Sequence, residues 1–201
     1  MNRRPAPIEG PQVRLRVPRP EDLPTLFDWY SDPERVSPFD RFGIDSFEGF
    51  RREVEEAIGS PTSLAPRFVV ERRDGDRLLG CVGHYRAHPV LTILDVWYMM
   101  GEPAERGKGY GSEAVGLLVD HLFRTEPVER IGATCAVENA ASIHLLEKLG
   151  FRREGTLAAT LFHHGGWHDT HVYGVTRSAW AGRSRSGTPP RSSPPRDPSP
   201  R

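Results

Sequence analysis

The chain has 201 residues, 37% of them hydrophobic, and its 27 basic and 27 acidic side chains give a net charge of zero. This length suits one domain with its own core, and the charge balance provides no overall field that would favour nucleic acid or a membrane surface. The sequence contains no run of about 18 apolar residues, so it predicts no membrane span.

Apolar residues recur every two residues in some segments, which is typical of strands. In other segments they recur about every 3.6 residues, which is typical of helices. Strands are predicted over residues 13–17, 67–72, 77–86, 91–100, 130–137, 151–162 and 167–176. Helices are predicted over residues 21–30, 46–58, 109–124 and 139–149. An α/β fold, with a mixed sheet and helices on both faces, accommodates this order.

We expect one domain over residues 12–181. Residues 1–11 are polar and rich in proline, and residues 182–201 consist mainly of arginine, serine and proline. Such segments bury too little apolar surface to offset the entropy of ordering, so both are predicted to be disordered. Cys81 and Cys135 lie in apolar segments and are expected to be buried thiols, which favours a cytoplasmic protein, and no cysteine or histidine spacing indicates a metal site.

A glycine-rich loop follows the predicted strand 91–100. The strand ends at Gly101 and Pro103, glycine recurs at positions 107, 109 and 111, and a helical pattern then begins. Glycine lets a backbone approach a ligand closely, and the N–H groups at a helix start carry partial positive charge. The sequence therefore predicts a phosphate or pyrophosphate site. Neither the dinucleotide-binding glycine fingerprint nor the P-loop pattern is present.

The pattern Arg-x-x-Gly-x-Gly at 106–111, between a strand and a helix, resembles the acyl-coenzyme A pyrophosphate loop of the GNAT superfamily of N-acetyltransferases. Two further segments, 137–151 and 165–173, resemble the ribosomal-protein alanine N-acetyltransferase, or Rim-type, branch of that superfamily. The order of elements over about residues 12–180 also matches the GNAT fold, which implies a mostly antiparallel sheet that splays at the cofactor site.

The resemblance implies acetyl-CoA as co-substrate and direct transfer of its acetyl group to an amine. Main-chain groups near Met99 and Met100 would bind the pantetheine arm. Asn139 and Ser142 would line the site near the thioester, although a helix cap and a first-turn helix residue are the structural alternatives. The cofactor loop would comprise Arg106, Gly107, Lys108, Gly109, Tyr110, Gly111 and Ser112.

The sequence identifies the catalytic acid and base less clearly than the cofactor loop. Many superfamily members carry a tyrosine acid where this chain has Leu146, so the resemblance implies Ser142 in that role. An attacking amine with a pKa near 8–10 is mostly protonated at neutral pH, so a base is needed. Asp95 and His84 are the candidates; a polar strand residue and a structural histidine are the alternative interpretations.

Two functions are consistent with the sequence. The first is an acetyl-CoA-dependent N-acetyltransferase acting on a primary amine, either a protein N-terminus or a small molecule such as an antibiotic. The second is a non-catalytic acyl-CoA-binding or regulatory domain. A homodimer is left open, and no nucleic-acid partner is expected from the short arginine-containing tail. Acidic residues weakly indicate a cationic acceptor, or are an ordinary charged helix surface: Glu34, Asp40, Asp45, Glu48, Glu53, Glu55 and Glu56.

Overall fold

The computed structural model describes residues 6–32, 46–57, 67–75, 77–88, 90–163 and 165–186. Its strands are β1 (Ile8–Glu9), β2 (Val13–Arg16), β3 (Phe68–Arg72), β4 (Leu78–Arg86), β5 (Leu94–Met100), β6 (Arg130–Ala136), β7 (Arg152–His163) and β8 (Gly166–Thr176). Its α-helices are α1 (Leu23–Ser31), α2 (Phe47–Ala57), α3 (Tyr110–Thr125), α4 (Ala140–Lys148) and α5 (Arg177–Ser186). Short 3-10 turns, η1 (Pro20–Asp22) and η2 (Pro103–Glu105), precede α1 and the glycine-rich loop.

All eight strands form one sheet in the order β1-β2-β3-β4-β5-β6-β8-β7. Each neighbouring pair is antiparallel except β5 and β6, which run parallel. These two strands pair at only two positions, Leu94 with Ile131 and Asp95 with Gly132, and separate beyond them. The predicted fold class is therefore confirmed, including the splay, which lies between β5 and β6.

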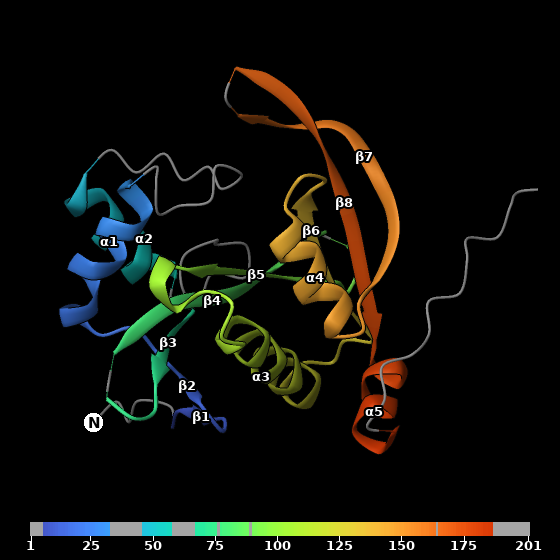
Figure 1. The fold of residues 1–201 in the computed structure, drawn as a ribbon, viewed down its shortest axis with the longest axis horizontal. Coiled ribbons are helices and arrows are strands. Elements are labelled where there is room, and N and C mark those ends of the chain that lie inside the picture. The colour runs from blue at the N-terminus through green and yellow to red at the C-terminus, as the bar shows by residue number, and fades with distance from the viewer. Residues whose placement is uncertain are drawn as a thin grey trace, which may run out of the picture.

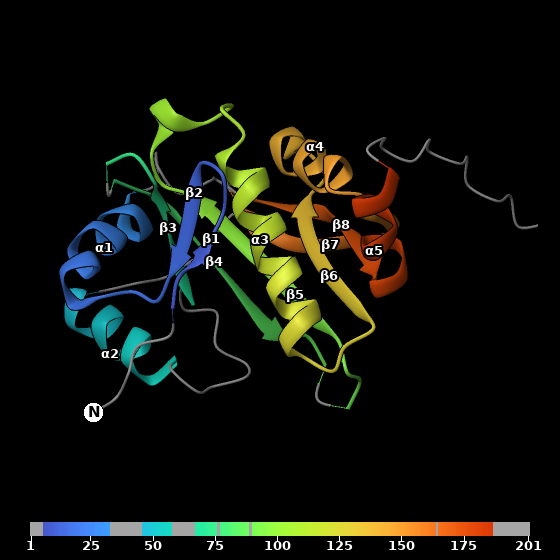
Figure 2. The same ribbon diagram turned by 90° about the horizontal axis from the view of Figure 1, so that it is seen from below.

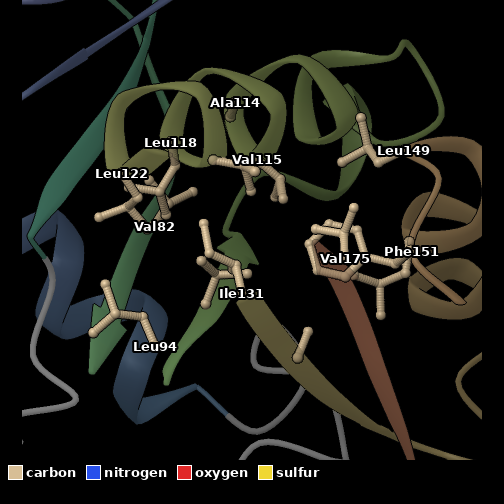
Figure 3. Close-up of a cluster of buried hydrophobic side chains, with 14 of the residues drawn as sticks. Val82, Leu94, Ala114, Val115, Leu118, Leu122, Ile131, Leu149, Phe151 and Val175 are labelled. Carbon is tan, nitrogen blue, oxygen red and sulfur yellow. The ribbon is translucent and has the colours of Figure 1, made fainter. Parts of the chain in front are cut away.

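Helices cover both faces of the sheet (Figures 1 and 2). On one face, the apolar side of α3 packs onto the strands, and Figure 3 shows Val115 and Leu118 directed at Val82 and Ile131. On the other face, α1 and α2 pack over β3 and β4, with Trp29 fully buried there. The central strands β3, β4 and β5 therefore contribute to two separate apolar clusters, one on each face of the sheet.

Alternation along β5 decides which side chains face which helices. Val96, Tyr98 and Met100 belong to the cluster under α3, whereas Trp97 and Met99 belong to the cluster under α1 and α2. The strand that leads into the glycine-rich loop therefore presents chemically different side chains on the two faces of the sheet.

Two segments that were predicted to be disordered contain regular secondary structure. Ile8 and Glu9 form β1, because they pair with β2 beside the start of α3. Helix α5 extends past residue 181, and the Arg183 guanidinium stacks over Trp180, 4.2 Å from its centroid, and donates to the Leu149 carbonyl. Residues 1–5 and 187–201 lie outside the described residues, and the domain limits 12–181 stay a prediction.

The remaining details agree with the sequence predictions, except for the start of one strand. β5 begins at Leu94 rather than at residue 91. The predicted N-cap of α2 is confirmed, since the Gly49 N–H donates to Ser46 Oγ at 3.1 Å. Cys81 and Cys135 are both buried and free, as predicted. Within the described part of the chain, no helix combines the length and apolarity needed to cross a membrane.

Candidate active site

A cavity of about 550 Å³ lies where β5 and β6 separate. Its lining includes Tyr98 and Cys135, which face α3, and also Tyr85, Trp97 and Thr134, which face the opposite way. Because side chains from both faces of the sheet line it, the cavity passes through the splay from one face to the other. A volume of this size is in the usual range for a small-molecule site.

The glycine-rich loop forms one end of the cavity. Gly107 has φ 77° and Gly109 has φ 92°, a left-handed conformation that side chains disfavour. The first α3 amide with a main-chain acceptor is that of Glu113, which donates to Gly109 O at 3.0 Å. The N–H groups of residues 110–112 therefore project from the helix start, where the dipole favours an anion. This geometry is compatible with an anion site, and its role as the pyrophosphate site stays a prediction.

Most charged side chains of the loop are bound to the protein. The Arg106 guanidinium donates to Met100 O at 3.0 Å, which fastens the loop to the end of β5. Lys108 Nζ lies 2.9 Å from Glu105 Oε2. The backbone, more than these two side chains, is thus the part of the loop presented to a ligand.

The main chain of β5 forms one wall of the opening. Gly101 N donates to Leu79 O at 3.0 Å, and in an antiparallel ladder the direction of these groups alternates along the strand. The N–H and C=O groups of Tyr98 therefore face the splay, as do those of Met100, whereas those of Met99 face β4. Met99 is a predicted cofactor-binding residue, but in this register its main-chain groups point away from the cavity.

Helix α4 contributes the predicted polar residues. Asn139 Oδ1 accepts a hydrogen bond from the Ser142 N–H at 3.0 Å, so Asn139 is the predicted helix cap. The Ser142 hydroxyl lies 2.5 Å from the hydroxyl of Tyr98, and all three residues line the cavity. Tyr98 was not among the residues predicted from the sequence, although its place one residue before Met99 on an alternating strand was an available signal.

A family model described as "Acetyltransferase (GNAT) domain" matches residues 12–152, which is more than half of the chain. The chain belongs to the GNAT family. Acetyl-CoA is its co-substrate, and it transfers the acetyl group to an amine. The alternative of a non-catalytic acyl-CoA-binding domain is not favoured.

Relatives support this assignment. A spermidine N(1)-acetyltransferase of Vibrio cholerae is 30% identical over 175 residues, covering 86% of this chain and 98% of the relative. A ribosomal-protein-serine acetyltransferase of Escherichia coli is 26% identical over 131 residues, covering 65% and 72%, in line with the Rim-type resemblance. The crystal structure of spermidine N-acetyltransferase from Vibrio cholerae, in complex with CoA and spermine, shares the fold with a TM-score of 0.75 at 24% identity, covering 86% and 99%.

Cys135 raises the question of a covalent intermediate in this acetyltransferase, because its thiol lines the cavity. Burial, with a smaller contribution from Glu147, raises the pKa of Cys135 to about 11. A thiol is nucleophilic only as the thiolate, which is scarce at neutral pH under these conditions. The environment of Cys135 thus favours direct attack by the amine over an acetyl-cysteine step.

Asp95 lies at the start of the splay, outside the residues that line the cavity. A Cβ placed on Gly132 would come within 2.2 Å of Asp95 Oδ1, so the carboxylate lies flat across the paired part of β5 and β6. Burial raises its pKa, partly opposed by Arg130. Its cross-strand partner Tyr85 does line the cavity, so Asp95 borders the site without entering it.

His84 is the other candidate base. This side chain lies on the α3 face, and burial together with nearby Arg67 and His121 lowers the pKa of His84 to about 4. Its Nδ1 is buried without a hydrogen-bond partner among the described residues. It does not line the cavity, so the geometry does not bring it together with Ser142, and its catalytic role stays a prediction.

Proposed function

We propose that the chain binds acetyl-CoA along the α3 and α4 side of the cavity and transfers its acetyl group within the splay. The single observation that carries this proposal is the cavity itself, which joins the loop at Gly107–Gly109 to the Tyr98–Ser142 pair. The pyrophosphate would lie against the N–H groups of the loop and helix start. The pantetheine arm would lie along the main chain of β5 at Tyr98 and Met100, on the side that faces the splay.

Tyr98 and Ser142 are suited to the leaving group. Their hydroxyls form a short hydrogen bond, so a proton given up by Tyr98 can be replaced through Ser142. A thiolate with a conjugate-acid pKa near 8.5 leaves fairly well unaided, so this donor is expected to contribute at the lower end of general acid catalysis. The splayed N–H groups of β5 would stabilise the oxyanion of the tetrahedral intermediate.

The acceptor is proposed to be a primary amine that enters from the face opposite α3, past Tyr85 and Trp97. The relatives named for spermidine and for a ribosomal protein support two acceptor classes, a small molecule and a protein, for which a protein N-terminus is the proposed form. The predicted acidic cluster adds little support for a cationic acceptor. On α2, Glu48 and Glu55 both pair with Arg51. Glu34, Asp40 and Asp45 lie outside the described residues. A homodimer and a cytoplasmic location also stay proposals.

Changing Tyr98 to phenylalanine tests the reaction part of this proposal. We expect kcat for acetyl-CoA-dependent thiol release to fall by about 10- to 100-fold, since the proton donor is lost, while KM for acetyl-CoA changes less than about threefold. Ser142→Ala should have a smaller effect in the same direction. The measurement is steady-state release of CoA thiol with a panel of primary amines.

Tyr173→Phe is the matched control for this prediction. Tyr173 is also buried, and its hydroxyl donates to Glu147 Oε1 at 3.3 Å, but it does not line the cavity. Its removal should leave kcat unchanged. A Tyr98→Phe enzyme with kcat within twofold of the unaltered chain would contradict the assigned role of Tyr98.

A further inference from the structure

A buried carboxylate stands directly before the loop that is proposed to bind a pyrophosphate. Glu105 is the last residue of η2 and is only 6% exposed. A negative charge at this place repels an anionic ligand. We therefore expect Glu105 to make a favourable contribution to binding that offsets this repulsion. Its contacts indicate what that contribution is.

Glu105 binds cations from two different segments. Its Oε2 accepts from Lys108 Nζ at 2.9 Å, within the loop. Its Oε1 lies 3.2 Å from the Arg77 guanidinium and 3.9 Å from that of Arg72, on the β3–β4 hairpin. The Lys108 ammonium, followed by the two arginines, holds the pKa of Glu105 below its usual value, so the carboxylate stays ionised.

Besides Glu105, the Arg106 hydrogen bond to Met100 O also fastens the loop, but the glycines that follow are held by little else. A Cβ on Gly107 or Gly109 would meet no atom within 4 Å, so the backbone at these positions stands clear of the surrounding protein. Glycine also loses more conformational entropy on ordering than any other residue. A loop built this way needs polar links at its ends, and Glu105 supplies one to the hairpin and one to Lys108.

We propose that Glu105 is a positioning residue for acetyl-CoA: it holds Lys108 against the β3–β4 hairpin, so that the loop already has its binding shape in the free protein. This inference rests on the proposed role of the loop as the pyrophosphate site. Preorganisation of this kind increases affinity because less ordering remains to be done on binding.

Glu105→Gln separates positioning from simple electrostatics by the sign of its effect. Removing a negative charge beside an anion site should tighten binding if electrostatics alone matters. If Glu105 positions the loop, the Kd for acetyl-CoA should instead rise by about tenfold, with kcat at saturating acetyl-CoA nearly unchanged. Calorimetric titration gives Kd, and thiol release with a fixed amine gives kcat.

Glu102→Gln is the matched control. Glu102 lies three residues earlier, binds Arg77 at 3.0 Å and accepts from Trp29 Nε1 at 3.3 Å, whereas the Lys108 ammonium donates to Glu105. This change removes the same charge from the same turn, so its Kd should stay equal or fall. An equal rise in Kd for both variants would overturn the specific role of Glu105.

Lys108→Met provides a second test, made at a residue that is half exposed. If Glu105 acts mainly through Lys108, adding Glu105→Gln to the Lys108→Met chain should change Kd less than about threefold. A full tenfold loss in that background, or no loss in the unaltered chain, would contradict the inference. Failure of the unaltered chain to bind acetyl-CoA would instead contradict the proposed function.

Discussion

Replacement of Gly109 by valine is expected to weaken acetyl-CoA binding by at least about 100-fold. Gly109 has φ 92° as the N-cap of α3, and a β-branched residue in this region is a genuine outlier. The new side chain would also enter the open space beside the loop where the phosphates are proposed to approach. Loop strain and direct exclusion of the ligand therefore act together. Calorimetric titration measures the effect, and thermal unfolding checks that the fold is intact.

Two companion variants make this result interpretable. Gly109→Ala keeps the strain of a residue with a Cβ in a left-handed conformation but adds little bulk. Its affinity for acetyl-CoA should therefore lie between those of the Gly109→Val protein and the unaltered chain. Gly75→Val places the same side chain in the β3–β4 turn, where a Cβ meets no atom within 4 Å and φ is not left-handed, so affinity should not change. Wild-type affinity in the Gly109→Val protein would remove the loop from the proposed site.

Removal of residues 177–201 is expected to lower the melting temperature by about 10 °C. This deletion takes away Trp180, which is 8% exposed, packs near Phe123 and Phe151, and donates to Asp120 Oδ1 at 2.6 Å. Loss of a buried tryptophan side chain alone costs about 3–5 kcal/mol. The deletion also removes the Arg177 guanidinium, which donates to the Val128 and Glu126 carbonyls at 2.6 and 3.0 Å, just beyond α3.

A deletion of residues 187–201 is the matched comparison. That segment begins after α5 and contains almost nothing apolar, so its removal should leave the melting temperature nearly unchanged. A cut at residue 183 would be a poorer control, because Arg183 stacks on Trp180. Equal melting temperatures for the two truncated proteins would show that α5 contributes no stability.

Much of the fold follows from local patterns in the sequence. The spacing of Ala114, Val115, Leu118 and Leu122 predicts one buried face of a helix, and these residues do form the core under α3. Asn139 before a helical run predicts a cap, and the cap is present. In these places propensity, periodicity and packing favour the same structure, so the sequence alone is sufficient.

What the sequence did not predict depends on contacts between distant segments. Tyr98 and Ser142 are 44 residues apart and meet only because β5 and β6 separate where α4 lies over them. Glu105 is an ordinary acidic residue in the sequence, and its role emerges only when Arg77 is brought beside it. Likewise, α5 is polar in composition, and the burial of Trp180 is decided by Phe123 and Phe151.

We propose that acetyl-CoA occupies the cavity between β5 and β6, with its pyrophosphate on the glycine-rich loop. Amide hydrogen exchange of the full chain, with and without saturating acetyl-CoA, tests it most directly, because the proposed contacts are made largely by backbone N–H groups. We predict added protection at residues 106–112 and at 96–100 of β5. Tight binding with protection confined to other segments would contradict the account.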